Sequence, residues 1–137
     1  MSDVTDRLLA AMNTHDLDAF VACFAVDYES RQPAHPNRAF RGRDQVRRNW
    51  RGVFSGIPDF TAEVLLTVVM GDGVEVSEWR WHGTHTDGAP FAMQGMVVTG
   101  VERDQIAWQR LYVEPIEQGG ADIDEMVRGT YRPGDRT

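Results

Sequence analysis

The last long strand-like stretch of the chain, residues 105–114, carries the side chains best suited to chemistry. Alternate residues of a β-strand share one face, which would place five of them together: Ile106, Trp108, Arg110, Tyr112 and Glu114. A carboxylate that faces an apolar interior is well suited to proton transfer near neutral pH. We therefore predict that Glu114 donates or accepts a proton, while Arg110 and Tyr112 orient a substrate or stabilise negative charge. The alternative interpretation is an ion pair of Glu114 with Arg110 or Arg80 that only joins strands.

Two histidines end the tryptophan-rich segment, and two nearby histidines can share a zinc ion. His82 and His85 are three residues apart, so on one strand they would point to opposite faces, and no third ligand is apparent. No metal is therefore predicted. His85 stays a candidate acid or base, although a hydrogen-bonded structural role is the simpler interpretation. Tyr28, on a predicted short strand, is a further candidate for orienting a substrate.

Residues 74–87, VEVSEWRWHGTHTD, are predicted to form the strand around which the sheet is organised. Val74 and Val76 occupy one phase of this strand and Trp79 and Trp81 the other, so strict alternation cannot bury all four. Either a bulge near residues 77–78 resets the phase, or both faces are buried, one of them against a partner subunit. Both arrangements suit a cupped sheet with a pocket inside and an oligomer interface outside.

Helical spacing of apolar residues predicts three helices before the sheet. The first begins at Asp3 or Thr5, the second is capped by Asp16, and the third starts near Gly42 and ends at Pro58. A short strand at residues 28–31 and a loop at residues 32–41 separate the second and third helices. Strand-like alternation then covers residues 60–70, 74–87, 91–101 and 105–114. Helices followed by a strand meander indicate an α+β domain with its helices packed on one face of an antiparallel sheet.

The first strand of this meander has an apolar face, formed by every even-numbered residue from Phe60 to Met70. The residues between them are mixed, so the alternation predicts a strand with one apolar and one mixed face. After the last strand, residues 118–137 form a tail with a short helix predicted from Asp122 to Val127 and a polar end.

Composition restricts the kinds of protein that this chain can be. Its 137 residues suffice for one domain with its own core, and 42% hydrophobic with 26% charged residues is ordinary for a globular protein. A net charge of -7 argues against a nucleic-acid-binding surface. The chain has no lysine, which excludes Schiff-base and covalent pyridoxal chemistry. Six arginines within residues 38–51 form either a solvated face or an anion site.

The single cysteine, Cys23, excludes an internal disulfide and is expected to be a small core residue in a reducing compartment. The first residues lack the apolar segment of a signal peptide, and no apolar run reaches the length of a membrane span. We predict a soluble cytoplasmic protein that binds neither membranes nor nucleic acids.

Three segments together resemble the nuclear transport factor 2-like superfamily, and within it the SnoaL-like branch. They are GRDQVRRNWRGVFSGIPDF, EWRWHGTHTDG and GVERDQIAWQRLYVEP, and the resemblance covers about residues 6–117 of a single domain that spans residues 1–137. It implies a cone-shaped α+β half-barrel, in which three N-terminal helices pack on a strongly curved antiparallel sheet and enclose an apolar pocket. Members are often dimeric, which implies a homodimer that forms through the outer face of the sheet.

The resemblance also suggests roles for individual residues. Glu114 falls where polyketide cyclases and epoxide hydrolases carry a catalytic aspartate on the last strand. Trp79 and Trp81 stand where the epoxide hydrolase has an arginine and an aspartate, which argues against epoxide opening by that mechanism. Tyr28 resembles the pocket tyrosine of the ketosteroid isomerase branch. Where cyclases usually present an inward histidine, residues 91–101 offer only Met93, Gln94 and Met96.

Two functions from different classes fit these residues. The first is a cofactor-independent isomerase, cyclase or hydratase that acts on a small hydrophobic substrate by carboxylate acid–base chemistry. Its catalytic candidates are Glu114, His85, Arg110 and Tyr28. The second is a noncatalytic module that binds a hydrophobic small molecule. The residues predicted to contact that molecule are the same in both cases: Trp50, Trp79, Trp81, Met93, Trp108, Tyr112 and His35.

A third, less favoured interpretation is an interaction domain that works through the outer face of its sheet. No cofactor is expected under any of the three.

Overall fold

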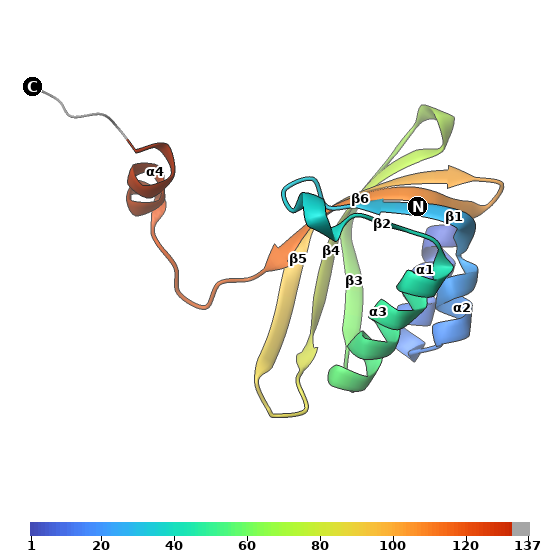
Figure 1. Cartoon of the computed structure of the whole chain (residues 1–137), viewed down its shortest axis with the longest axis horizontal. Helices are drawn as coiled ribbons and strands as arrows, with labels where there is room; N and C mark the ends of the chain where they lie inside the picture. The colour runs from blue at the N-terminus through green and yellow to red at the C-terminus, as the bar shows by residue number, and fades with distance from the viewer. Residues whose placement is uncertain (133–137) are drawn as a thin grey trace, which may run out of the picture.

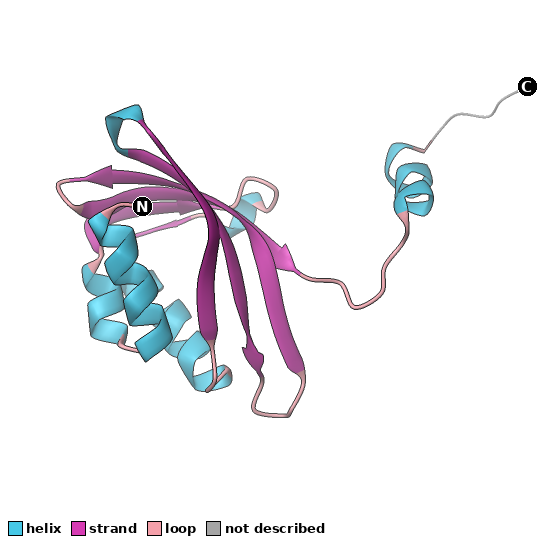
Figure 2. Ribbon diagram, turned by 180° about the vertical axis from the view of Figure 1, so that it is seen from behind, coloured by secondary structure: helices cyan, strands magenta, loops and turns pink. Residues whose placement is uncertain are grey.

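The computed structural model describes residues 1–132, and residues 133–137, which include the polar end of the predicted tail, lie outside the described part. Three helices, α1 (Asp3–Thr14), α2 (Leu17–Ala22) and α3 (Arg43–Gly56), lie together on one face of a six-stranded sheet (Figures 1 and 2). The sheet curves around these helices and stays open (Figure 2). This arrangement confirms the predicted α+β fold.

The sheet has the strand order β2-β1-β6-β5-β4-β3. Neighbouring strands are antiparallel except β1 and β6, which run parallel. The four long strands predicted from alternation are present, and β1 and β2 extend the sheet beyond the last of them. The strands are β1 (Phe24–Arg31), β2 (Phe40–Arg41), β3 (Thr61–Met70), β4 (Val74–Thr84), β5 (Pro90–Glu102) and β6 (Gln105–Pro115). Two short 3-10 turns, η1 (Pro36–Arg38) and η2 (Gly71–Gly73), lie in the β1–β2 and β3–β4 connections.

Each N-terminal helix has an identifiable start signal. Ser2, one residue before the predicted cap, accepts a hydrogen bond from the Thr5 N–H at 3.3 Å and begins α1. Asp16 caps α2 as predicted, with its carboxylate 3.0 Å from the Ala19 nitrogen. Gly42 precedes α3 with a φ of 91°, a conformation that glycine adopts without strain.

The phase conflict in β4 is resolved without any bulge on β4 itself. This strand keeps an unbroken register with β5, so its tryptophans share the inner face with Glu75 and Ser77 rather than with the valines. The bulge lies on β3, where Leu65 is the extra residue between Val64 and Leu66. Of the two predicted arrangements, the bulge near residues 77–78 is therefore wrong in position, and burial of the outer face against a partner subunit stays a prediction.

Burying Glu75 on the inner face requires hydrogen-bond partners for its charge. The residue is only 2% exposed. Its carboxylate accepts hydrogen bonds from the Ser2 nitrogen at 3.1 Å, the Ser2 hydroxyl at 2.7 Å and the Thr5 hydroxyl at 3.0 Å. The start of α1 thus satisfies the buried carboxylate and fixes the helix on the sheet.

The bulge on β3 also exposes the second half of that strand. Beyond it, Leu66, Val68 and Met70 are 54%, 52% and 54% exposed on the sheet face opposite the helices. The apolar alternation of residues 60–70 therefore does not stay on one face past Val64, because one extra residue shifts every following side chain to the other face.

A second bulge changes the phase of β6. Val101 pairs with Ile106 and Gly100 pairs with Trp108, so Ala107 is the extra residue. Ile106 is completely buried, but the inner face beyond the bulge is formed by Gln109, Leu111 and Val113. The prediction that Ile106, Trp108, Arg110, Tyr112 and Glu114 share one inner face is therefore wrong.

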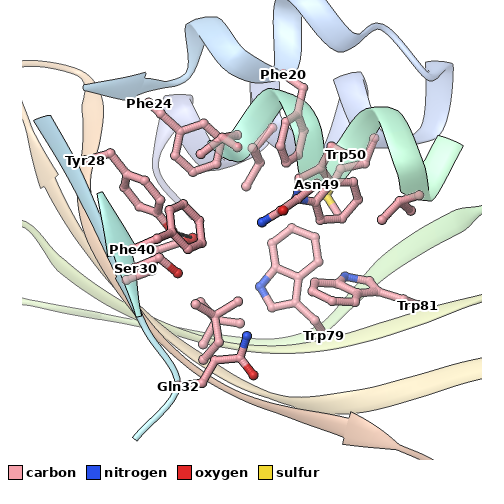
Figure 3. Close-up of a pocket in the computed structure, with 17 residues that line it drawn as sticks. Phe20, Phe24, Tyr28, Ser30, Gln32, Phe40, Asn49, Trp50, Trp79 and Trp81 are labelled. Carbon is pink, nitrogen blue, oxygen red and sulfur yellow. Dashed lines mark hydrogen bonds between the residues drawn. The ribbon is translucent and has the colours of Figure 1, made fainter. Parts of the chain in front are cut away.

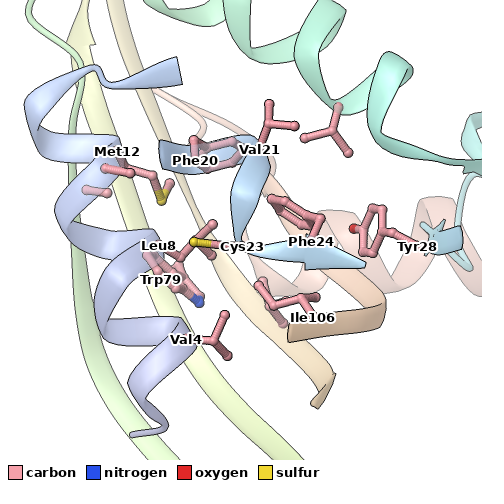
Figure 4. Close-up of a cluster of buried hydrophobic side chains, with 14 of the residues drawn as sticks. Val4, Leu8, Met12, Phe20, Val21, Cys23, Phe24, Tyr28, Trp79 and Ile106 are labelled. Carbon is pink, nitrogen blue, oxygen red and sulfur yellow. The ribbon is translucent and has the colours of Figure 1, made fainter. Parts of the chain in front are cut away.

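The core lies between α1, α2 and the inner face of the sheet (Figure 4). Its tightly buried side chains, each at most 5% exposed, include Val4, Leu8, Met12, Phe20, Trp79 and Ile106. Cys23 is a core residue, as predicted: it is 2% exposed, its Sγ lies 3.4 Å from the Ala19 carbonyl oxygen, and burial raises the pKa of its thiol.

Helix α4 (Ile123–Tyr131) is longer than the helix predicted in the tail and stands apart from the domain (Figure 1). Every described residue from Glu114 onward is exposed. Among the described helices, α4 included, none combines the length and the apolar character that a membrane crossing would need.

Candidate functional site

The main cavity lies between the helices and the inner face of the sheet (Figure 3). Its volume is about 210 Å³. Helices α1, α2 and α3 supply one wall, and β1, β2, β4, β5 and β6 supply the other. The bulge on β6 and the phase of β4 therefore decide which side chains reach it.

Aromatic rings form most of the cavity wall. Phe20 packs against Trp50 with ring centroids 4.5 Å apart, and Trp50 meets Trp81 edge to face at 5.6 Å and 82°. The indole nitrogen of Trp81 is buried and has no hydrogen-bond partner, whereas that of Trp79 faces the open centre of the cavity in Figure 3. Trp50, Trp79 and Trp81 were predicted to contact a ligand, and all three line this cavity. Phe24 and Phe40 complete the aromatic set.

Hydrogen-bonding groups lie among the rings on the β1 and β6 side. The Tyr28 hydroxyl donates to Gln109 Oε1 at 2.7 Å, and Gln109 Nε2 donates to Thr99 Oγ1 at 3.3 Å. Burial raises the pKa of Tyr28, an effect that a hydrogen bond with Ser30 opposes. Tyr28 is therefore un-ionised at neutral pH and serves as a hydrogen-bonding group. The remaining polar residues that line the cavity are Ser30, Gln32 and Asn49.

None of the described residues that line this cavity is an aspartate, a glutamate, a histidine or an arginine. Proton transfer by a carboxylate or an imidazole, as in the first sequence-based hypothesis, has no matching group on this wall. Nor does the described part of the chain hold any group of three or more His, Cys, Asp or Glu side chains that could bind a metal.

Glu114 lies outside the cavity, on the outer face of β6. Its side chain is 51% exposed, and Oε1 is 2.7 Å from His35 Nε2. The structure therefore brings together two of the predicted site residues, but at the surface. Arg110 and Tyr112 share this outer face and border a second, open cavity of about 400 Å³, together with Arg31 and the loop after it.

The other predicted residues are also separate from the main cavity. His85 lies in the β4–β5 connection, where its ring meets the edge of Phe91 at 5.6 Å. Met93 packs against the core, and Trp108 lies on the outer face beside Gly100. Of the candidates named from the sequence, Tyr28, Trp50, Trp79 and Trp81 alone line the cavity within the described residues.

The lining residues that were not named from the sequence include all of the uncharged polar ones except Tyr28 and the tryptophans. Gln109, Ser30, Gln32 and Asn49 line the cavity, although none was named as a candidate. One signal was available: Gln109, Leu111 and Val113 alternate as a mainly apolar phase, which is more typical of an inner face than the charged phase beside it.

Together, the helices, the curved open sheet and the cavity between them define a nuclear transport factor 2-like α+β cone. The model of the SnoaL-like domain matches residues 5–109, which is most of the chain. This protein belongs to the SnoaL-like domain family, in agreement with the resemblance of its three sequence segments.

Solved structures show the same fold. IdmH from Streptomyces antibioticus, a candidate polyketide cyclase, is 24% identical with a TM-score of 0.70, over 82% of this chain and 90% of that chain. A candidate polyketide cyclase from Sinorhizobium meliloti is 19% identical with a TM-score of 0.65, over 83% of this chain and 95% of that chain. A protein with a ketosteroid isomerase-like fold from Catenulispora acidiphila, in complex with trimethylamine, is 17% identical with a TM-score of 0.69, over 80% of this chain and 84% of that chain. No curated protein sequence matches this chain.

Proposed function

We propose that this protein binds a neutral, flat and largely apolar small molecule in the cavity between its helices and its sheet. The observation that carries the proposal is the lining, which is rich in aromatic rings and, within the described residues, has no charged side chain. Aromatic walls favour flat apolar groups. An uncharged wall cannot replace the hydration that an ionised ligand loses on burial.

The hydrogen-bonding side of the cavity would orient the ligand. The Tyr28 hydroxyl donates its hydrogen bond to Gln109, so its oxygen can still accept a hydrogen bond from a ligand. The amide nitrogens of Gln32 and Asn49 can donate, whereas their oxygens already accept hydrogen bonds from Arg38 and Gln45. A ligand with one hydroxyl or carbonyl group beside a ring system would use these partners and the tryptophans together.

The proposal can be tested with two probes that share a ring system and differ in charge, 2-naphthalenemethanol and 2-naphthoate. We expect the alcohol to quench tryptophan fluorescence with a Kd at least about tenfold lower than that of the carboxylate, because the buried carboxylate would lack a charged partner. Equal or tighter binding of the carboxylate, or no binding of either probe, would contradict the proposal. Gln109→Leu should weaken binding of the alcohol, whereas Glu114→Gln, outside the cavity, should leave it unchanged.

A cyclase- or isomerase-type activity is the second candidate. It is favoured by the un-ionised Tyr28 hydroxyl, which lies inside the cavity among uncharged groups. A phenol that turns its proton from Gln109 towards a substrate carbonyl would stabilise the negative charge that gathers on that oxygen. Two structural neighbours are described as candidate polyketide cyclases, although the likeness at this identity extends to the fold alone. An acid–base role for Glu114 would require a substrate that binds on the outer face.

Proton exchange at the methyl group next to the carbonyl of 2-acetonaphthone, followed by NMR in D₂O, tests this second candidate. Solvent water or deuteroxide would take the methyl proton, because no described lining residue is a carboxylate or an imidazole, and the Tyr28 hydroxyl would stabilise the enolate oxygen. Exchange should therefore be faster with the protein than without it, and Tyr28→Phe should remove at least about tenfold of that acceleration. Glu114→Gln should retain it if the cavity is the site. Exchange no faster than in buffer alone would reject the enzymatic candidate and leave the binding function.

A further inference from the structure

Helix α4 has the features of a segment that docks on another surface. Asp122 caps it by accepting a hydrogen bond from the Glu125 N–H at 2.9 Å. Its apolar residues recur at positions i, i+3, i+4 and i+8, which places them on one face of the helix. They are Ile123, Met126, Val127 and Tyr131, with 68%, 39%, 37% and 69% of their surface exposed.

No described residue of the chain covers this apolar face, because α4 stands apart from the domain (Figures 1 and 2). An isolated helix of nine residues is barely stable in water, since most helical stability in proteins comes from packing of the apolar face. The helix therefore gains stability wherever its apolar face is buried.

The outer face of the sheet is a second apolar surface that the described residues leave uncovered. All three N-terminal helices pack on the other face of the sheet (Figure 2). On β6, Tyr112 is 44% exposed, and its partner Met96 on β5 is half-buried beside it. Leu66, Val68 and Met70 add to this face at the opposite edge of the sheet.

The two surfaces carry opposite charges at the arginine end of the outer face, whereas Glu78 and Glu114 lie on that face beside Met96 and Tyr112. Next to Tyr112, Arg110 forms no ion pair with a described residue. Arg31 forms an ion pair with Glu29 and with no other described residue. The segment before α4 and the first turn of α4 carry mainly negative charge, from Glu117, Asp122 and Asp124. Within the described chain these carboxylates also form no ion pair. An α4 that lies over Tyr112 and Met96 can bring these carboxylates towards the arginines.

The direction in which the chain leaves the sheet favours a second molecule over self-docking. The Ile116 N–H donates to the Ala92 carbonyl at 3.0 Å, so the ladder continues past the end of β6 and directs the connection along the strand axis. Figures 1 and 2 show the connection running away from the domain's own sheet. Seven residues, 116–122, can reach about 24 Å when extended.

We propose that α4 is an arm that docks on the outer sheet face of a second copy of this chain, over Tyr112 and Met96. Because the contact is reciprocal in a two-fold pair, each chain gives one arm and receives one. The homodimer expected through the outer sheet face would then be held by two exchanged arms. This proposal is independent of the ligand that the cavity binds.

The first test compares two double alanine variants of the full chain. Met126→Ala with Val127→Ala removes the apolar face of α4, and sedimentation equilibrium should show a dimer Kd raised at least about tenfold. Glu125→Ala with Arg128→Ala is the matched control, because it leaves the net charge unchanged, introduces the same residue type and alters the opposite face. The control should leave the dimer Kd unchanged.

The second test determines where the arm docks. A chain with Tyr112→Cys mixed with a chain with Met126→Cys should give a disulfide-linked heterodimer under mild oxidation, in higher yield than either variant alone. Cys23 is buried and does not compete. The proposal is overturned if the native chain is monomeric or if both alanine variants dimerise equally well. It is also overturned if the disulfide forms only in a chain that carries both cysteine substitutions, because the arm would then dock within its own molecule.

Discussion

At the scale of single residues, the polar side chains in the cavity differ in kind from those on the surface. The charged candidates Glu114 and Arg110 lie outside, where water and neighbouring charges stabilise them. Inside the cavity lie a phenol and amides, which form hydrogen bonds with one another, as Tyr28 does with Gln109. An uncharged hydrogen-bonding lining loses less hydration on burial than a charged one, which is why it can lie among aromatic rings.

The raised pKa of Tyr28 predicts a dependence of stability on alkaline pH. Above the ordinary tyrosine pKa of about 10, the unfolded chain releases a proton that the folded chain retains, so the free energy of unfolding decreases as pH rises. Below that pH the residue has no effect on the pH dependence. For Tyr28→Phe, the free energy of unfolding should therefore decrease less steeply with pH than it does for the native chain. The two slopes should differ by up to about 1.4 kcal/mol per pH unit in urea unfolding series from about pH 8 to about pH 11.

The native chain, measured over the same pH range, gives the reference slope for this comparison. An unchanged slope for Tyr28→Phe would show that Tyr28 ionises in the folded protein as readily as in the unfolded chain.

At the scale of elements, two bulges decide which side chains meet the cavity. The extra residue Leu65 turns the second half of β3 outward, and the extra residue Ala107 turns Gln109 inward. Alternation in the sequence predicted every long strand correctly, because a strand needs only local pattern to be recognised. It could not predict the phase past a bulge, because a bulge depends on pairing with a neighbouring strand.

Close packing of β5 on β6 gives a prediction at the same scale. A Cβ at Gly95 would collide with the Tyr112 carbonyl oxygen and lie 2.6 Å from the Val113 Cα. Gly95→Ala should therefore lower the free energy of unfolding by about 1–3 kcal/mol, because backbone atoms must move to admit the methyl group. Chemical denaturation measures this change.

Gly52→Ala is the matched control, because Gly52 lies in α3 with nothing within 4 Å of an added Cβ. Alanine has the higher helix propensity, so this variant should be more stable than the native chain by up to about 1 kcal/mol. If both alanine variants had the same stability as the native chain, the close approach at Gly95 would not constrain the sheet.

At the scale of the whole molecule, the curved sheet separates two faces with different surroundings. Its inner face, with the helices, encloses the aromatic cavity, and its outer face carries Tyr112, Leu66, Val68 and Met70 without cover from any described residue. The resemblance to SnoaL-like proteins correctly predicted the helix–sheet cone, and the homodimer through the outer face stays a prediction. Helix α4 and the outer face are the two apolar surfaces that a second copy could cover at once.

The sequence by itself determined the helices, the long strands, the α+β class and three of the tryptophans around the cavity. These follow from apolar periodicity, capping residues and motif segments, all of which act over short distances along the chain. Only the tertiary structure decided that Glu114 and Arg110 face outward, that Glu75 is buried beneath the start of α1, and that Gln109 lines the cavity. The physical reason is that a side chain's face is set by strand pairing and by distant hydrogen-bond partners, so one extra residue in a strand exchanges inside for outside.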